Sequence, residues 1–177
     1  MSSVTTNAGG TLVMNGGVVN TTGAQIYGEA ATLGAATTLT STGAGAITFG
    51  NTLNGAHTLA VNTAGATTFT GAVGDSAALT SLTTDAGGTV AINGGAVNTS
   101  GNQTYAGAVT LGAATTLTAS NVNTTTGSTV AGASNSLNVT GNASLGGDVS
   151  GVSSIGVNGT TTLAGNVSST GNQTYAG

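Results

Sequence analysis

Five side chains in this sequence have the chemistry to transfer a proton or to bind a metal ion. They are the acids Glu29, Asp75, Asp85 and Asp148 and the single histidine, His57. Enzymes that cleave glycosidic or acyl bonds use clustered carboxylates, or a serine, a histidine and an acid held together. Here the acids are spread along the chain, and only Asp75 and Asp85 are near each other in sequence. The sequence therefore contains no local cluster of catalytic residues.

The partners that such sites need are also scarce. Many sugar-cleaving β-helices use Arg or Lys as a base or to stabilise charge, and this chain has neither. His57 could join Asp75 and a serine, but its turn sequence Asn-Gly-Ala-His favours a solvated corner. A calcium-binding β-roll needs tandem Gly-Gly-x-Gly-x-Asp motifs, and residues 146–149 match only a fragment. We expect no enzyme, and no catalytic, cofactor-binding or metal-binding residues.

The overall composition excludes further classes. The 177 residues include 32 glycines, no Lys, Arg, Pro or Cys, and a net charge of −4. Without basic residues there is no cationic surface for nucleic acid or anionic lipid. No apolar run approaches the roughly 18 residues of a membrane span, and the first residues lack the pattern of a signal peptide. We expect no nucleic-acid binding and no membrane insertion of this segment.

A long internal repeat organises the sequence. Residues 5–40 match residues 83–118 at 25 of 36 positions, with an offset of 78 residues. A third copy begins near residue 166, because Asn166–Gly177 matches Ala96–Gly107 and both end in Gly-Asn-Gln-Thr-Tyr-Ala-Gly. Duplication of this kind indicates a repeat architecture. We interpret residues 1–177 as one repetitive segment, an excerpt of a longer array.

A shorter repeat of about 20 residues indicates the fold. A bulky apolar residue, any residue, Gly, any residue and Val recur at 69–73, 105–109, 145–149 and 163–167. Apolar residues around these motifs alternate with polar ones, as in Leu59/Val61 and Val109/Leu111, which is the period of a strand. Asn-Gly pairs could mark antiparallel hairpins, but a fixed period near 20 is typical of a coil whose turns stack.

The sequence therefore predicts an all-β, right-handed parallel β-helix, or β-solenoid, of roughly nine turns without any helix. Each turn adds about 4.8 Å, so the rod would be about 40 Å long. We expect nine side chains to point inward: Val61, Phe69, Val73, Val139, Leu145, Val149, Val157, Leu163 and Val167. Neither end has a capping sequence, so end-to-end self-association is expected.

Residues 83–118 resemble the shaft repeats of filamentous-haemagglutinin-type exoproteins and similar giant bacterial adhesins. That resemblance implies export by two-partner secretion or as an autotransporter to the outer surface of a Gram-negative bacterium. It implies a structural stalk, whose parent protein would attach to glycans or proteins of host or neighbouring cells or support biofilm.

The alternative function is ice binding, or binding to another flat surface, through outward threonines. The candidate segments are Thr38–Thr40, Thr68–Thr70, Thr116–Thr118 and Thr160–Thr162. Their starting positions do not differ by multiples of about 20, which argues against a single rank of threonines.

Overall fold

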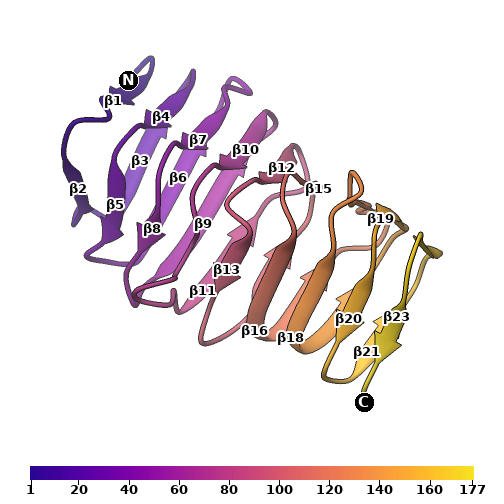
Figure 1. Cartoon of the computed structure of the whole chain (residues 1–177). Coiled ribbons are helices and arrows are strands. Elements are labelled where there is room, and N and C mark those ends of the chain that lie inside the picture. The colour runs from indigo at the N-terminus through magenta and orange to yellow at the C-terminus, as the bar shows by residue number, and fades with distance from the viewer.

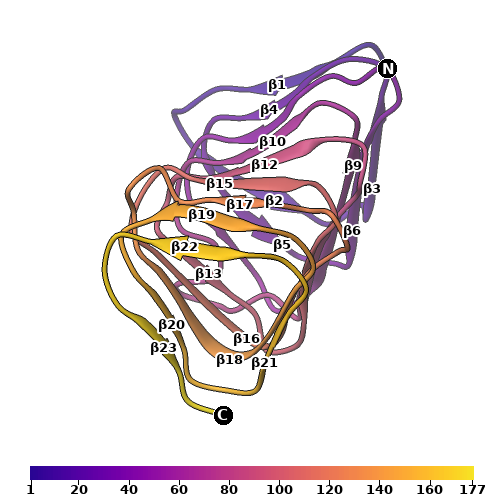
Figure 2. The ribbon, with the colours of Figure 1, turned by 90° about the vertical axis from the view of Figure 1, so that its right-hand side faces the viewer.

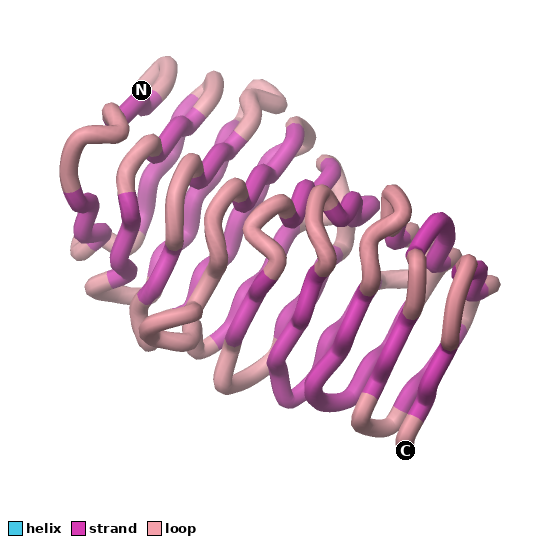
Figure 3. Tube along the Cα trace, viewed as in Figure 1, coloured by secondary structure: helices cyan, strands magenta, loops and turns pink.

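Twenty-three short strands and no helix form the molecule, and the chain winds into a coil whose turns stack as a rod (Figures 1 and 3). The structure is a computed structural model that describes residues 1–177. All strand pairs are parallel. The two termini lie at opposite ends of the rod (Figure 1).

Each turn places strands on three faces, which we call faces A, B and C in chain order. Face A contains β1 (Val4–Thr6), β4 (Gln25–Tyr27), β7 (Ile47–Phe49), β10 (Ala66–Phe69), β12 (Thr89–Ile92), β15 (Ala108–Leu111), β17 (Val130–Ala131), β19 (Val149–Val152) and β22 (Val167–Ser169). Face B contains β2 (Thr11–Met14), β5 (Ala30–Leu33), β8 (Leu53–Asn54), the bridge at Val73, β13 (Ala96–Asn98), the first parts of β16 (Thr115–Thr124) and β18 (Leu137–Leu145), β20 (Ile155–Val157) and β23 (Gln173–Tyr175). Face C contains β3 (Val18–Thr21), β6 (Thr37–Ser41), β9 (Thr58–Thr63), β11 (Ser81–Thr84), β14 (Gln103–Tyr105), the second parts of β16 and β18, and β21 (Thr161–Leu163).

The number and length of the turns agree with the sequence. Face A has nine strands, so the coil completes eight turns and begins a ninth, which reaches face B (Figure 2). Successive turns contain about 20 residues. At about 4.8 Å per turn the rod is about 40 Å long. The predicted parallel β-solenoid is confirmed.

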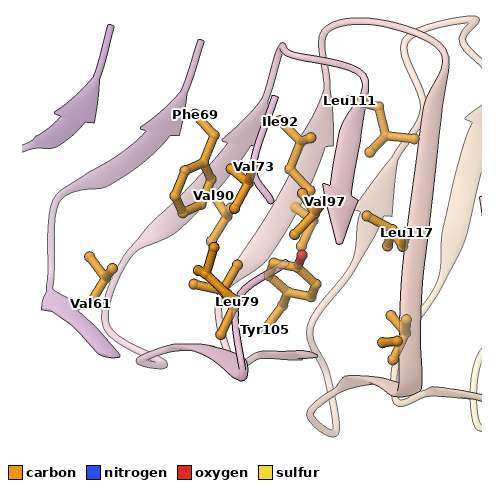
Figure 4. Close-up of a cluster of buried hydrophobic side chains, with 14 of the residues drawn as sticks. Val61, Phe69, Val73, Leu79, Val90, Ile92, Val97, Tyr105, Leu111 and Leu117 are labelled. Atoms are coloured by element: carbon orange, nitrogen blue, oxygen red, sulfur yellow. The ribbon is translucent and has the colours of Figure 1, made fainter. Parts of the chain in front are cut away.

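The core consists of columns of side chains, one residue from each turn. On face B the register aligns Leu12, Ala31, Leu53, Val73, Val97, Leu117, Val139, Val157 and Tyr175. On face A, Tyr27, Phe49 and Phe69 stack with ring centroids 5.3 and 5.5 Å apart, and Ile92 and Leu111 continue that column (Figure 4). In all, 32 buried apolar residues form one core. Stacking like on like buries apolar surface even though bulky residues are few.

Seven of the nine side chains predicted to point inward are buried. The exceptions are Leu163, which is 42% exposed, and Val167, which is half-buried. Both occupy the expected columns, since Leu163 aligns with Leu145 and Val167 aligns with Val149. They lie in the outermost strands of their faces, where no further turn covers them.

The recurring glycine of the short motif lies at a corner between two faces. A Cβ at Gly107 would lie 2.1 Å from the carbonyl oxygen of Gly88 in the turn below, and a Cβ at Gly147 would lie 2.4 Å from that of Ser128. At these distances any side chain would collide with backbone. The motif therefore marks a corner at which consecutive turns pack too closely for a Cβ. It occurs at two different corners, because Phe69 and Val73 join faces A and B, whereas Tyr105 and Val109 join faces C and A.

The 78-residue repeat does not return to the face on which it began. Residues 5–40 supply strands to faces A, B, C, A, B and C, whereas residues 83–118 supply them to faces C, A, B, C, A and B. The offset thus spans 11 strand positions, one fewer than four turns of three. Successive copies of the repeat are turned by one face around the rod.

Candidate functional site

The acidic residues lie apart from one another, at separate corners of the rod. Glu29 follows β4 and accepts a hydrogen bond from the Thr6 hydroxyl, whereas Asp148 is exposed and accepts one from the Asn166 backbone N–H at 2.8 Å. Asp75 precedes β11 and Asp85 follows it, so the two acids closest in sequence lie at opposite ends of a strand. No group of three His, Cys, Asp or Glu residues could hold a metal ion.

His57 is half-buried at the corner between faces B and C. Its backbone carbonyl accepts a hydrogen bond from Thr80 N–H at 2.9 Å, which fixes this corner to the next turn. The imidazole makes no hydrogen bond. Asp75 lies in the loop one turn further along the same corner, where its carboxylate accepts a hydrogen bond from Ser76 N–H. The histidine, acid and serine are not joined into a triad.

The interior of the rod is closed along its length. The one internal void, lined by Tyr105, Leu117 and neighbouring apolar residues, has a volume of about 10 Å³, the space of about one water molecule. Larger hollows lie at the open N-terminal end and on the outer surface. The outer faces and the two ends are therefore where this molecule can meet another one.

A buried glutamine–tyrosine pair recurs in each copy of the repeat. The hydroxyl of Tyr105 donates to Oε1 of Gln103 at 3.0 Å, and the Gln103 amide donates to the carbonyl oxygens of Val97 at 2.8 Å and Thr118 at 3.0 Å. These carbonyls belong to consecutive turns of face B. The glutamine thus joins two turns from inside the rod.

The other two copies build the same pair on the other two faces. Tyr27 donates to Gln25 at 2.8 Å on face A, and Tyr175 donates to Gln173 at 3.2 Å on face B. In every copy the glutamine amide reaches the carbonyl six residues earlier, that of Val19, Val97 or Val167. Sequence reasoning found this heptapeptide but missed the inward glutamine, because an uncharged polar residue in a strand is normally placed outside.

Burial changes the acidity of the tyrosines. Loss of solvation raises the pKa of Tyr27 to about 12 and raises the pKa of Tyr105 further, because the phenolate form has no water around it. The phenol therefore remains a hydrogen-bond donor to glutamine throughout the physiological pH range.

Asparagines form a short ladder on the surface. The Asn121 side-chain amide donates to Oδ1 of Asn102 at 2.9 Å, and that of Asn142 donates to Oδ1 of Asn121 at 3.1 Å. The three residues occupy one corner on consecutive turns. The expectation that corner asparagines stack is confirmed here, and the ladder links the turns from outside as the glutamines do from inside.

Outward threonines do not gather on one face. Of the candidate segments for a flat binding surface, Thr38 lies on face C, Thr68 on face A and Thr116 on face B. Within face A the outward rank reads Thr5, Ile26, Thr48, Thr68, Ala91 and Thr110, so apolar residues interrupt it. The irregular sequence spacing of these segments therefore corresponds to three separate faces.

No protein-family model, curated protein or solved structure matches this chain. The molecule also contains no helix of the length and apolar character needed to cross a membrane. The resemblance to haemagglutinin-type shafts therefore stays a prediction.

Proposed function

We propose that this chain is a non-enzymatic shaft segment of a secreted or cell-surface bacterial adhesin and that its function is to provide length. The parent protein would carry the contact with glycans or proteins of host or neighbouring cells. The shaft would be exported to the outer surface of a Gram-negative cell by two-partner secretion or autotransport. This proposal joins the solenoid fold to the sequence resemblance.

The observation that carries the proposal is the rotation of the repeat by one face. A solenoid that binds a flat surface needs the same residues on one face, so its repeat should contain a whole number of turns. This repeat contains 11 strand positions, so each copy presents its outward residues on a different face. The three copies of the glutamine–tyrosine pair occupy faces A, C and B. Such a sequence maintains stacking and length without selecting a face.

Immunogold labelling of intact source cells tests the location. Antibodies raised against residues 83–118 should label filaments outside the cell without permeabilisation, and external protease should remove the label. Label that requires permeabilisation would contradict the proposal.

Attachment assays test the role of the segment. In the natural protein, outward substitutions such as Thr68→Ala and Thr104→Ala should leave attachment unchanged, because they alter neither the length of the rod nor its core. Deletion of residues 5–82 should shorten the rod by about 18 Å at about 4.8 Å per turn. A loss of attachment from the threonine substitutions alone would indicate a binding face, and ice shaping by the purified chain would support the alternative function.

A further inference from the structure

Both ends of the rod leave strand edges unpaired on all three faces. At the N-terminal end these are the edges of β1, β2 and β3, and at the C-terminal end they are the edges of β21, β22 and β23. Edge strands present rows of free N–H and C=O groups that can pair with another chain. Here all the exposed edges at one end run parallel to those they would meet at the other.

The core columns are also open at both ends. Val4, Leu12 and Val19 are only partly buried at the N-terminal end, where they line a hollow of about 290 Å³. At the C-terminal end Leu163 is 42% and Tyr175 is 36% exposed. Each end therefore offers apolar side chains surrounded by free backbone groups.

The shape of the ends determines how two copies can fit. The coil stops after a strand on face B, so its next strand position lies on face C. A second copy continues the coil without a gap when its β1 pairs with β21, its β2 with β22 and its β3 with β23. That fit turns the second copy by one face, the same rotation that the 78-residue repeat makes within the chain.

Side-chain register across this junction follows from residues 78 positions further along. Leu12 corresponds to Val90, which lies in the face A column that ends at Val167, and Val19 corresponds to Val97, which lies in the face B column that ends at Tyr175. In the junction Val167 therefore meets Leu12 of the second copy. By the same register Tyr175 meets Val19 of the second copy.

The buried glutamines supply an independent match. The Gln25 and Gln103 amides each donate to a second carbonyl 15 residues ahead, in the following turn, whereas the Gln173 amide has only Val167 to donate to. In the junction the carbonyl of Val13 of the second copy takes that position, because the register places Val13 beside Ser168. The C-terminal end thus carries a donor that the N-terminal end can satisfy.

We propose that copies of this 177-residue chain stack head to tail into a filament, each copy turned by one face relative to the last. A turn of about 20 residues covers about 600 Å² per end, so the junction buries about 1,200 Å² in total, the lower bound of stable protein interfaces. Because the two contacting surfaces differ, the contact does not close and growth continues.

Sedimentation velocity over a concentration series, with negative-stain electron microscopy, tests this stacking. Wild type should form filaments of increasing length as concentration rises. Leu12→Asp should block the N-terminal end and Val167→Asp the C-terminal end, so each variant alone should be monomeric. An equimolar mixture should form one-to-one dimers, because one intact C-terminal end meets one intact N-terminal end.

Thr104→Asp is the matched control, since it adds the same charge on the outward side of a central strand and should form filaments as wild type does. Far-UV circular dichroism should show unchanged β structure in all variants. Wild type that remains monomeric at every concentration, dimers of either single variant, or a mixture without dimers would overturn the proposal. These outcomes are read on the purified chain, so they are separate from the test of the cellular role.

Discussion

Gly17 and Gly95 have the same backbone conformation, with φ of +73°, although they lie at different corners of the rod. A Cβ at Gly17 would lie 3.1 Å from the carbonyl oxygen of Ala36, and a Cβ at Gly95 would lie 3.1 Å from that of Ala114. The first corner joins faces B and C, and the second joins faces A and B. Equal sequence thus forms an equal corner wherever the coil places it.

Alanine at these two glycines should therefore have equal effects. Gly17→Ala and Gly95→Ala should each cost about 1–3 kcal/mol, because L-residues are strained at this positive φ and the methyl group presses on a carbonyl. Gly10→Ala is the control, since nothing lies within 4 Å of its Cβ position. Thermal melting would measure all three. A large loss at one corner and none at the other would contradict the equivalence of the faces.

A buried hydroxyl without a partner offers a stabilising substitution. Thr84 Oγ1 is buried and makes no hydrogen bond, whereas Thr124, two turns along the same face C column, accepts a hydrogen bond from Gly146 N–H at 2.8 Å. Thr84→Val should raise the free energy of unfolding by about 1 kcal/mol, because a methyl group needs no partner. Thr124→Val should lower it by about 1–3 kcal/mol, because it leaves the Gly146 N–H unpaired. Denaturant unfolding of the two variants should shift in opposite directions.

The glutamine–tyrosine pair can be tested at two depths of burial. Gln103→Leu should cost about 1–3 kcal/mol, because the buried Tyr105 hydroxyl loses its acceptor. Gln173→Leu removes the same motif in the exposed final turn and should change stability by less than about 0.5 kcal/mol. Hydrogen exchange should show opening around residues 97–118 in the first variant only. Equal effects would show that the pair contributes through local strand structure instead of burial.

Alkali should unfold the rod through its buried tyrosines. An unfolded tyrosine loses its proton near pH 10, whereas the pKa of folded Tyr27 is about 12, so unfolding releases protons between these values and rising pH favours it. This contribution to stability is complete below pH 10 and is lost as pH rises to about 12. Tyr27→Phe should flatten the decline. A pH-independent melting temperature between pH 9 and pH 12 would contradict the burial of these phenols.

The sequence was sufficient for the fold but not for the arrangement of its repeats. The period near 20 and the alternation around residues such as Val61 and Val139 predict stacked parallel turns with those residues inside, and both are buried. The rotation of the repeat depends on the number of strands in each turn, which sequence periodicity left at two or three. Once three is known, the offset of 78 residues corresponds to 11 strands.

The inward glutamines were missed for a related reason. Their acceptors are backbone carbonyls in two turns, such as those of Val97 and Thr118, and no sequence pattern shows a backbone group. The exposure of Leu163 likewise depends on its place in the last strand of face C, not on its local sequence.

The rotation of the repeat is the central claim, and distances between paired spin labels test it most directly. The chain has no cysteine, so pairs of introduced cysteines can be labelled without background. Thr110 aligns through Ala91 with Thr68 on face A, so a label pair at Thr68 and Thr110 should be about 10 Å apart, two turns at about 4.8 Å. A pair at Asn54 and Thr110 should be further apart, because Asn54 lies on face B with Thr32, the sequence equivalent of Thr110. A repeat that returned to its own face would place Thr110 above Asn54 in the column of Thr32, and a long Thr68–Thr110 distance would contradict the rotation.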